Sequence, residues 1–307
     1  MKYAINSDFK KLKLLTFPVV KEFAPVAEKV LGVLIDAEHS NSSVDVLKFK
    51  ITSENKKIKC LLYSPKNSNG NLPLLVYYHG GGFIYKSAPY HYKLVKDYCV
   101  LAKCRVLVAD YRNTPGNRFP EIFNDCYNTL KWAVKNSSAI RVIPEKIAVA
   151  GDSAGGCLAA ATVLKARDEK LVNLCGQMLV YPVLDSRMSS KSMKNYSDTP
   201  VWNSKLNAKM WQLYKPQNMQ ENEKAYYSPA LENDFKNLPK TYIQTAEYDC
   251  LHDEGVEYAN AIKNAGNDVE LCETKGTVHG FEMALNSKIT EKAVLDRVRF
   301  LKEIFNC

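Results

Sequence analysis

The stretch Lys146-Ile-Ala-Val-Ala-Gly-Asp-Ser-Ala-Gly-Gly-Cys-Leu-Ala-Ala-Ala161 decides the fold of this 307-residue chain. A short run of β-branched residues and alanine leads into Gly-Asp-Ser-Ala-Gly, and an alanine-rich helical pattern follows at once. The pattern predicts a strand, a sharp turn and a helix, with Ser153 on the turn. The residues two before and two after such a serine must be small, and they are Gly151 and Gly155. The turn exposes the hydroxyl, and the start of the helix favours negative charge nearby.

The composition is typical of a globular protein with a sizeable core. Apolar residues make up 46% of the chain and charged residues 24%. No linker or internal repeat divides the sequence, so we expect residues 1–307 to form a single domain. The net charge of +9 comes from 42 basic and 33 acidic residues, but the lysines are scattered and no basic stripe is interleaved with aromatics. We therefore expect no nucleic-acid partner.

The nine cysteines form no Cys-x-x-Cys pair, so neither a zinc site nor a redox dithiol is expected. Free thiols in a reducing cytoplasm explain them best. The apolar run Leu14–Val20 is too short for a signal peptide and is broken by Pro18. Because no stretch approaches the roughly 18 apolar residues that span a bilayer, we expect a cytoplasmic protein without stable membrane insertion.

Strand and helix patterns alternate along most of the chain. Strands are predicted over eight segments: Val44–Ile51, Ile58–Ser64, Leu72–Tyr78, Cys104–Asp110, Lys146–Ala150, Gly176–Tyr181, Lys240–Ala246 and Val269–Glu273. Helical stripes separate most of them, which indicates an α/β fold with a mostly parallel, doubly wound sheet. Residues 8–37 read as one or two amphipathic helices, and residues 186–226 lack a strand pattern.

A serine nucleophile needs a base, and the chain has five histidines, at positions 39, 79, 91, 252 and 279. His279 lies in Thr277-Val-His-Gly-Phe281, on a loop after the last predicted strand. That position places it at the strand ends beside Ser153. His39 and His91 sit in polar contexts and are interpreted as surface residues.

The acid that orients the base should lie between the serine and the histidine in chain order. Asp249 follows a predicted strand directly, in Thr245-Ala-Glu-Tyr-Asp249. Glu247 and Asp253 are its rivals. We prefer Asp249, because Asp253 is placed to cap the helix that begins there.

The glycine-rich stretch Tyr78-His-Gly-Gly-Gly-Phe83 indicates the donors for an oxyanion. Its glycines leave backbone N–H groups unshielded, and each such donor is worth roughly 3–4 kcal/mol in the transition state. The Gly-x-Gly-x-x-Gly fingerprint and a P-loop lysine are both missing, so nucleotide binding is not expected. His79 is predicted to hold this loop by hydrogen bonds rather than to act as a second base.

Four motifs together resemble the hormone-sensitive-lipase-like branch of the α/β-hydrolase esterases: His79–Gly82, Gly151–Gly156, Ala246–Gly255 and His279–Phe281. The resemblance runs from about residue 45 to 300, with the motifs in the family's order and spacing. It implies an α/β-hydrolase fold with a mostly parallel, eight-stranded central sheet flanked by helices. A helical cap is then expected from about residues 1–45 and 186–226.

The resemblance implies a catalytic triad of Ser153, Asp249 and His279. It also implies an oxyanion hole made by the N–H groups of Gly81, Gly82 and Ala154. The supporting motif residues are His79, Gly80, Gly151, Asp152 and Gly155.

The activity that the resemblance implies is hydrolysis of short-chain carboxylic esters through an acyl-enzyme, without metal or cofactor, on a small-molecule substrate. Two alternatives stay open: deacetylation of acetylated sugars or aryl amides, and a non-catalytic receptor of the same fold. Plant gibberellin receptors resemble this fold but lose the histidine base. The oligomeric state is not decided, and a homodimer is one alternative. The chain departs from the family at Cys250 and His252, where proline and arginine are usual, and His252 is a candidate for the pocket entrance.

Overall fold

The computed structural model describes residues 2–14 and 43–306, and one eight-stranded sheet forms its centre. The strand order is β1-β2-β4-β3-β5-β6-β7-β8. β2 pairs antiparallel with β1 and β4, and the other neighbours pair parallel. The mostly parallel, eight-stranded α/β architecture predicted from the sequence is confirmed. The strands are β1 (Val44–Ser53), β2 (Lys56–Pro65), β3 (Leu72–Tyr78), β4 (Arg105–Asp110), β5 (Val142–Asp152), β6 (Gly176–Val180), β7 (Thr241–Tyr248) and β8 (Val269–Val278).

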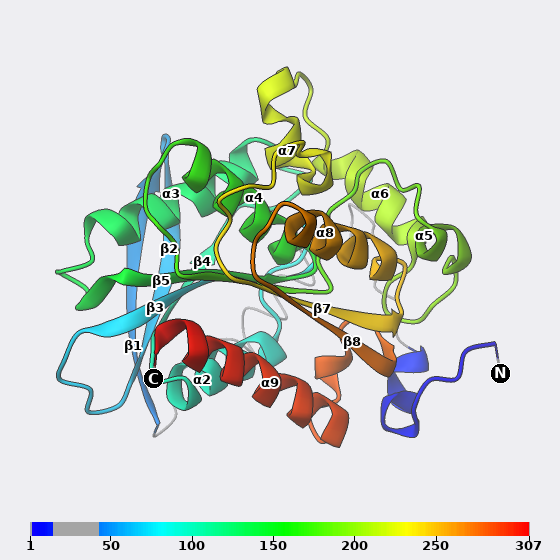
Figure 1. The fold of residues 1–307 in the computed structure, drawn as a ribbon, viewed down its shortest axis with the longest axis horizontal. Helices are drawn as coiled ribbons and strands as arrows, with labels where there is room; N and C mark the ends of the chain where they lie inside the picture. Colours follow the sequence, from blue (N-terminus) through cyan, green and yellow to red (C-terminus); the bar gives the residue numbers. More distant parts are fainter. Residues whose placement is uncertain (1, 15–42, 307) are drawn as a thin grey trace.

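Helices cover both faces of the sheet (Figure 1). One face carries α2 (Pro89–Leu101) and α9 (Lys288–Phe305). The other carries α3 (Glu121–Lys135), α4 (Ala154–Asp168) and α8 (His252–Asn264). Each layer of helices buries its own cluster of apolar side chains against the sheet. Among the described residues, no helix is long and apolar enough to cross a membrane.

The centre of the sheet follows from the apolar run of β3, which lies between β4 and β5. Its residues from Pro73 to Tyr78 are all buried, as expected for a strand covered on both faces. β8 differs from its predicted length, because it continues past Glu273 to Val278. Pairing with β7, in which Tyr248 lies opposite Val278, extends the strand through a polar stretch that its pattern alone did not mark.

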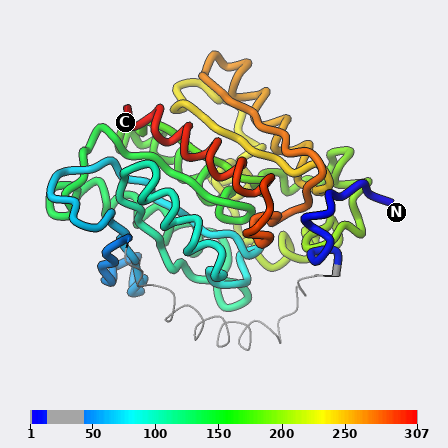
Figure 2. Tube along the Cα trace, turned by 90° about the horizontal axis from the view of Figure 1, so that it is seen from below, coloured from blue at the N-terminus to red at the C-terminus, as the bar shows by residue number. Residues whose placement is uncertain are grey.

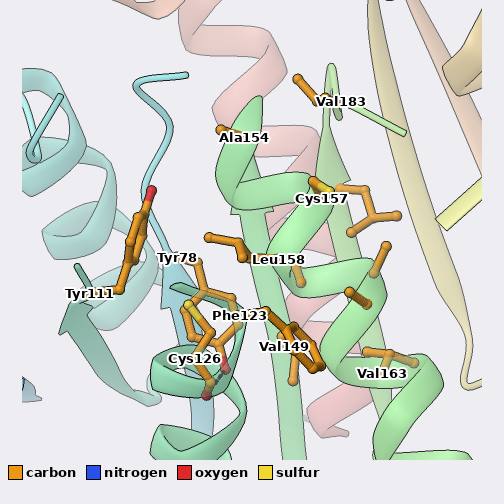
Figure 3. Packing of buried hydrophobic residues seen from close by; sticks show 14 of the residues in the cluster. Tyr78, Tyr111, Phe123, Cys126, Val149, Ala154, Cys157, Leu158, Val163 and Val183 are labelled. Atoms are coloured by element: carbon orange, nitrogen blue, oxygen red, sulfur yellow. Dashed lines mark hydrogen bonds between the residues drawn. The ribbon is translucent and has the colours of Figure 1, made fainter. Parts of the chain in front are cut away.

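The helix after the serine turn is buried on nearly all sides, because small residues let its neighbours approach closely. Figure 3 shows Ala154, Cys157 and Leu158 of α4 in the same apolar cluster as Val149 of β5 and Phe123 of α3. Only Lys165, Arg167 and Asp168 of α4 are not fully buried. This packing fixes the start of α4 against the ends of the central strands.

Residues 186–226 form short helices on the same side of the sheet as α4 and α8 (Figure 1). The helices are α5 (Lys191–Asn195), α6 (Ser204–Tyr214), η2 (Glu221–Glu223) and α7 (Lys224–Tyr227). Trp202 and Tyr214 are buried, and the Tyr214 ring stacks on Phe83 with centroids 3.8 Å apart. Aromatic side chains therefore attach this segment directly to the glycine-rich loop.

The N-terminal segment is described only in part. The 3₁₀ helix η1 (Ser7–Leu14) buries Phe9 and Leu12, two apolar residues of the segment predicted to form amphipathic helices. The remainder of the predicted helices, and residues 15–42 of the expected cap, lie outside the described residues. η1 packs beside the turn that precedes α9, where the Ser287 hydroxyl donates to Asp8 at 2.8 Å (Figure 2).

Candidate active site

Ser153 sits on a strained corner between β5 and α4. Its φ of 55° and ψ of −121° lie outside the common regions for a residue with a side chain. A Cβ on Gly151 would lie 2.1 Å from the Gly155 carbonyl oxygen, and a Cβ on Gly155 would lie 2.0 Å from that of Tyr78. Glycine is therefore required on both sides of the serine, as the spacing in the sequence predicts.

The structure brings together the three residues predicted to form a triad. The Ser153 Oγ lies 2.9 Å from His279 Nε2, and His279 Nδ1 lies 2.6 Å from Asp249 Oδ2. All three side chains are buried, and Asp249 also accepts the N–H of Leu251 at 3.0 Å. With Nδ1–H donating to the carboxylate, Nε2 keeps a lone pair for the serine hydroxyl.

These residues come from three different strand ends. Ser153 follows β5, Asp249 follows β7 and His279 follows β8. Parallel strands end at the same edge of the sheet, so residues distant in the chain meet there. The extension of β8 to Val278 is what carries His279 to that edge.

The rival acids bind elsewhere. Glu247 accepts the N–H of Gly276 at 2.6 Å, and Asp253 accepts the N–H of Ser192 at 2.7 Å. The expectation that Asp253 caps α8 is wrong, because the N-cap position is Leu251 and the helix begins at His252. Asp253 thus lies within the first turn and its carboxylate reaches the neighbouring α5 segment instead.

The glycine-rich loop presents backbone donors next to the serine corner. Gly81 and Gly82 have φ values of 127° and 60°, which glycine adopts without strain. The Gly81 carbonyl accepts the N–H groups of Ile84 and Tyr85, which folds the loop into a tight turn. Within residues 2–14 and 43–306, the N–H groups of Gly81, Gly82 and Ala154 have no protein acceptor. They are therefore available to an anionic oxygen.

His79 belongs to the loop's internal structure. Its Nδ1 lies 2.6 Å from the Gly80 carbonyl, and its ring stacks on Tyr111 with centroids 4.4 Å apart. Tyr111 in turn donates its hydroxyl to the His79 carbonyl at 2.6 Å. Burial lowers the pKa of His79 to about 4, and nearby His91 adds to the effect. This imidazole is therefore neutral at physiological pH.

Two residues near the site were not assigned their structural place by sequence reasoning. His91, interpreted as a surface residue, is buried, and its Nε2 lies 3.0 Å from Asp152 Oδ2. The prediction failed because polar neighbours in sequence say nothing about which side of α2 faces the sheet. A usable signal was Pro89, which predicts a helix start and hence places His91 in its first turn.

A buried tyrosine was also missed. The Tyr181 ring packs against His279 with centroids 4.6 Å apart, and its hydroxyl donates to Glu282 at 2.5 Å. Glu282 forms a buried ion pair with Arg297 of α9. Through this cluster, the loop that contains His279 is attached to α9, on the face of the sheet that α2 and α9 cover.

The remaining candidates are engaged in other contacts. His252, a candidate for the pocket entrance, binds Asp253 and Glu273, each at 2.9 Å. His39 lies outside the described residues. In the part of the chain that the structure describes, no cluster of three or more histidine, cysteine or acidic side chains could hold a metal ion. No disulfide joins any of the eight cysteines described there.

Comparisons with known proteins identify the family to which the chain belongs. Residues 75–283 match the protein family described as the alpha/beta hydrolase fold. An arylesterase from Saccharolobus solfataricus is 32% identical over 296 residues, which cover 92% of this chain and 92% of the relative. Carboxylesterase NlhH of Mycobacterium tuberculosis is 33% identical over 222 residues, covering 72% and 70%. The solved structure of a bacterial heroin esterase superposes with a TM-score of 0.89 at 30% identity and covers 98% of both chains.

Proposed function

The chain belongs to the α/β-hydrolase family, in its hormone-sensitive-lipase-like branch, and we propose that this carboxylic-ester hydrolase cleaves short-chain esters through an acyl-enzyme on Ser153. The observation that carries the proposal is the pair of hydrogen bonds from Ser153 to His279 and from His279 to Asp249. The alternative of a non-catalytic receptor lacks support, because such a receptor has no need of a base held in line with the serine.

The reaction begins with attack of Ser153 Oγ on the ester carbonyl carbon. His279 Nε2 takes the hydroxyl proton, and Asp249 stabilises the imidazolium through Nδ1–H. The negative charge that develops on the carbonyl oxygen is bound by the N–H groups of Gly81, Gly82 and Ala154. The first turn of α4 adds its favourable dipole at the same point.

Collapse of the tetrahedral intermediate expels the alcohol. His279 gives its proton to the leaving oxygen, and the acyl group stays on Ser153 as an ester. Water then enters, His279 removes its proton, and the same donors stabilise the second oxyanion. The second collapse returns the proton to Ser153 and releases the carboxylic acid. Each step uses only residues of this chain and water.

Trp202 supports a small substrate. A Cβ on Gly82 would lie 2.9 Å from the edge of its indole, so the ring sits directly on the oxyanion loop. The indole centroid is 6.1 Å from that of His279, and its N–H donates to Asn207 at 3.2 Å. A large, buried and hydrogen-bonded ring is slow to move aside. We therefore assign the enzyme to short acyl chains and small or flat alcohols.

We also place the enzyme in the cytoplasm. The support is that no disulfide joins the eight described cysteines, and six of them are buried. Disulfides form and persist in oxidising compartments, so a chain whose described cysteines form none fits a reducing compartment.

The test is the Ser153→Ala variant assayed on p-nitrophenyl acetate. Loss of the nucleophile should lower kcat by about four to six orders of magnitude. A fluorophosphonate should label the native enzyme at Ser153, located by peptide mass spectrometry, and should leave the variant unlabelled. Ser68→Ala, in the loop before β3, is the matched control and should keep full activity. A Ser153→Ala enzyme that retains the native rate would exclude the proposal.

A further inference from the structure

Asp152, the residue before the serine, is a buried carboxylate with three hydrogen-bond donors around it. Its Oδ1 accepts the hydroxyl of Tyr77 at 2.5 Å and the N–H of Gly80 at 2.9 Å. Its Oδ2 lies 3.0 Å from His91 Nε2. The residue is only 2% exposed, so these donors replace the water that an ionised carboxylate otherwise requires.

His91 is fixed in one orientation by its place in α2. Its Nδ1 accepts the N–H of Ala88 at 2.8 Å, directly before the first turn of the helix. Because Nδ1 is an acceptor, the proton of the neutral ring lies on Nε2 and is donated to Asp152. Both nitrogens of His91 are therefore occupied, and neither is free to take a proton from substrate or water.

The third donor connects this pair to the oxyanion loop. Gly80 precedes Gly81 and Gly82, whose N–H groups face the developing negative charge in the proposed mechanism. A Cβ on Gly80 would lie 2.3 Å from Asp152 Oδ2, so the carboxylate lies directly against the loop backbone. Asp152 also directly precedes Ser153 in the chain. One side chain thus couples the position of the nucleophile to the position of the donors.

We propose that His91 and Asp152 are positioning residues that hold the oxyanion loop at its working distance from the Ser153 corner, an inference that rests on the proposed esterase mechanism. His91 orients the carboxylate, the carboxylate holds Gly80, and Gly80 sets where Gly81 and Gly82 point. The pair does not contact substrate. Its effect is exerted on the transition state, because the oxyanion forms only there.

The experiment uses three variants of the full chain: Asp152→Asn, His91→Ala and His91→Gln. In Asp152→Asn the amide oxygen can accept from Tyr77 and Gly80, which leaves the amide NH₂ facing His91 Nε2–H. Two donors then face each other. If His91 instead carries its proton on Nδ1, the two facing donors are Nδ1–H and the N–H of Ala88. His91→Ala removes the donor, and His91→Gln keeps one of similar reach.

We expect kcat on p-nitrophenyl acetate to fall about 10- to 100-fold in Asp152→Asn and His91→Ala, with KM changed by less than about threefold. His91→Gln should recover part of the loss. A trifluoromethyl ketone reports the oxyanion directly, because Ser153 Oγ adds to its carbonyl carbon and the new oxyanion occupies the same donors. Its inhibition constant should rise by the same factor by which kcat/KM falls in each variant.

Thr129→Val is the control for lost stability. The buried Thr129 hydroxyl donates to the Asp125 carbonyl at 2.7 Å within α3, away from the loop. This variant should lower the melting temperature and leave kcat and the ketone affinity unchanged. Native kcat in the folded His91 and Asp152 variants, a loss confined to KM, or an unchanged ketone affinity would each overturn the proposal. Failure of all three variants to fold would assign the pair to stability and overturn it equally. The Ser153→Ala assay does not use these variants, so failure of this inference can be distinguished from failure of the proposed esterase mechanism.

Discussion

Asp152 and Ser153 are neighbours in the chain, and each hydrogen-bonds a buried histidine. His279 binds Asp249 through one nitrogen at 2.6 Å and faces the Ser153 hydroxyl through the other at 2.9 Å. His91 binds Asp152 at 3.0 Å, but its other nitrogen accepts a backbone N–H at 2.8 Å. Both arrangements are histidine–carboxylate pairs of similar burial, so residue type and burial do not separate a base from a structural group.

The difference lies in what the second nitrogen meets. A base needs a lone pair directed at the proton that it will remove, and His279 Nε2 has one because its partner is a hydroxyl. The partner of His91 Nδ1 is a backbone N–H that cannot give up its proton. The backbone N–H at the start of α2 therefore occupies the lone pair of His91, and this histidine holds Asp152 in place instead of accepting a proton.

The largest effect is expected when the same substitution is made in both pairs. Asp249→Asn leaves the triad in place but favours the tautomer with the proton on Nε2, where it blocks the serine. kcat should fall by about 10⁴-fold, against about 10- to 100-fold for Asp152→Asn. Steady-state kinetics on p-nitrophenyl acetate would measure both. Equal losses of kcat in the two variants would contradict the assignment of His279 as the base and of His91 as a positioning residue.

A smaller effect is expected on the free energy of unfolding in acid, where the buried imidazole of His79 should destabilise the folded chain. Burial lowers the pKa of His79 to about 4, whereas an unfolded histidine titrates near pH 6.5. As the pH falls from about 6.5 to 4, the unfolded chain binds a proton at this imidazole that the folded chain does not. This contribution to the free energy of unfolding, up to about 3 kcal/mol, is therefore present above pH 6.5 and lost across that interval.

Urea unfolding at pH 7 and pH 4.5 would measure it, with His79→Asn as the comparison. The variant should lose less stability than the native chain between the two pH values. Asp152 acts at lower pH: burial opposes ionisation, but His91 and Tyr77 outweigh it and lower the pKa of Asp152 to about 2. Its contribution should persist to about pH 4 and disappear as the pH approaches 2. Parallel curves for the native chain and His79→Asn would argue against a buried neutral His79.

The smallest effect is expected at the support of the catalytic histidine. Tyr181→Phe keeps the ring on His279 but leaves one Glu282 oxygen without its donor. Loss of a hydrogen bond to a charged group costs about 1.5–3 kcal/mol in stability. kcat should fall by less than about tenfold, since the ring still orients the imidazole. Thermal melting and kinetics on the same preparation would measure both, and a loss comparable to that of Asp249→Asn would give the hydroxyl a direct part in the reaction.

Much of the site could be predicted because its chemistry constrains local sequence. Gly151 and Gly155 mark the corner at Ser153, since any Cβ there would collide with backbone. Gly81 and Gly82 mark the loop through their positive φ values. His279 was predicted from its place after the last predicted strand, and Asp249 from its place directly after the strand before it. In each case a short motif carries the physical requirement.

Other features could not be predicted because they depend on partners far away in the chain. Asp253 was expected to cap α8, but α8 begins at His252 and the Asp253 carboxylate reaches Ser192, 61 residues earlier. The length of β8 depended on pairing with β7 rather than on its own polar residues. The burial of Tyr181, Glu282 and Arg297 depended on the meeting of three elements.

The sequence by itself determined the fold family, the serine corner and the identity of the proposed triad, because these rest on residues whose backbone or chemistry allows few substitutes. Only the tertiary structure decided which histidine has a free lone pair and which is locked. That distinction depends on the atom opposite each ring nitrogen, the Ser153 hydroxyl for His279 and the Ala88 N–H for His91. His279 reaches Ser153 because β8 extends along β7 to Val278, and His91 reaches Asp152 across 61 residues of the chain; no local sequence pattern records either of these two meetings.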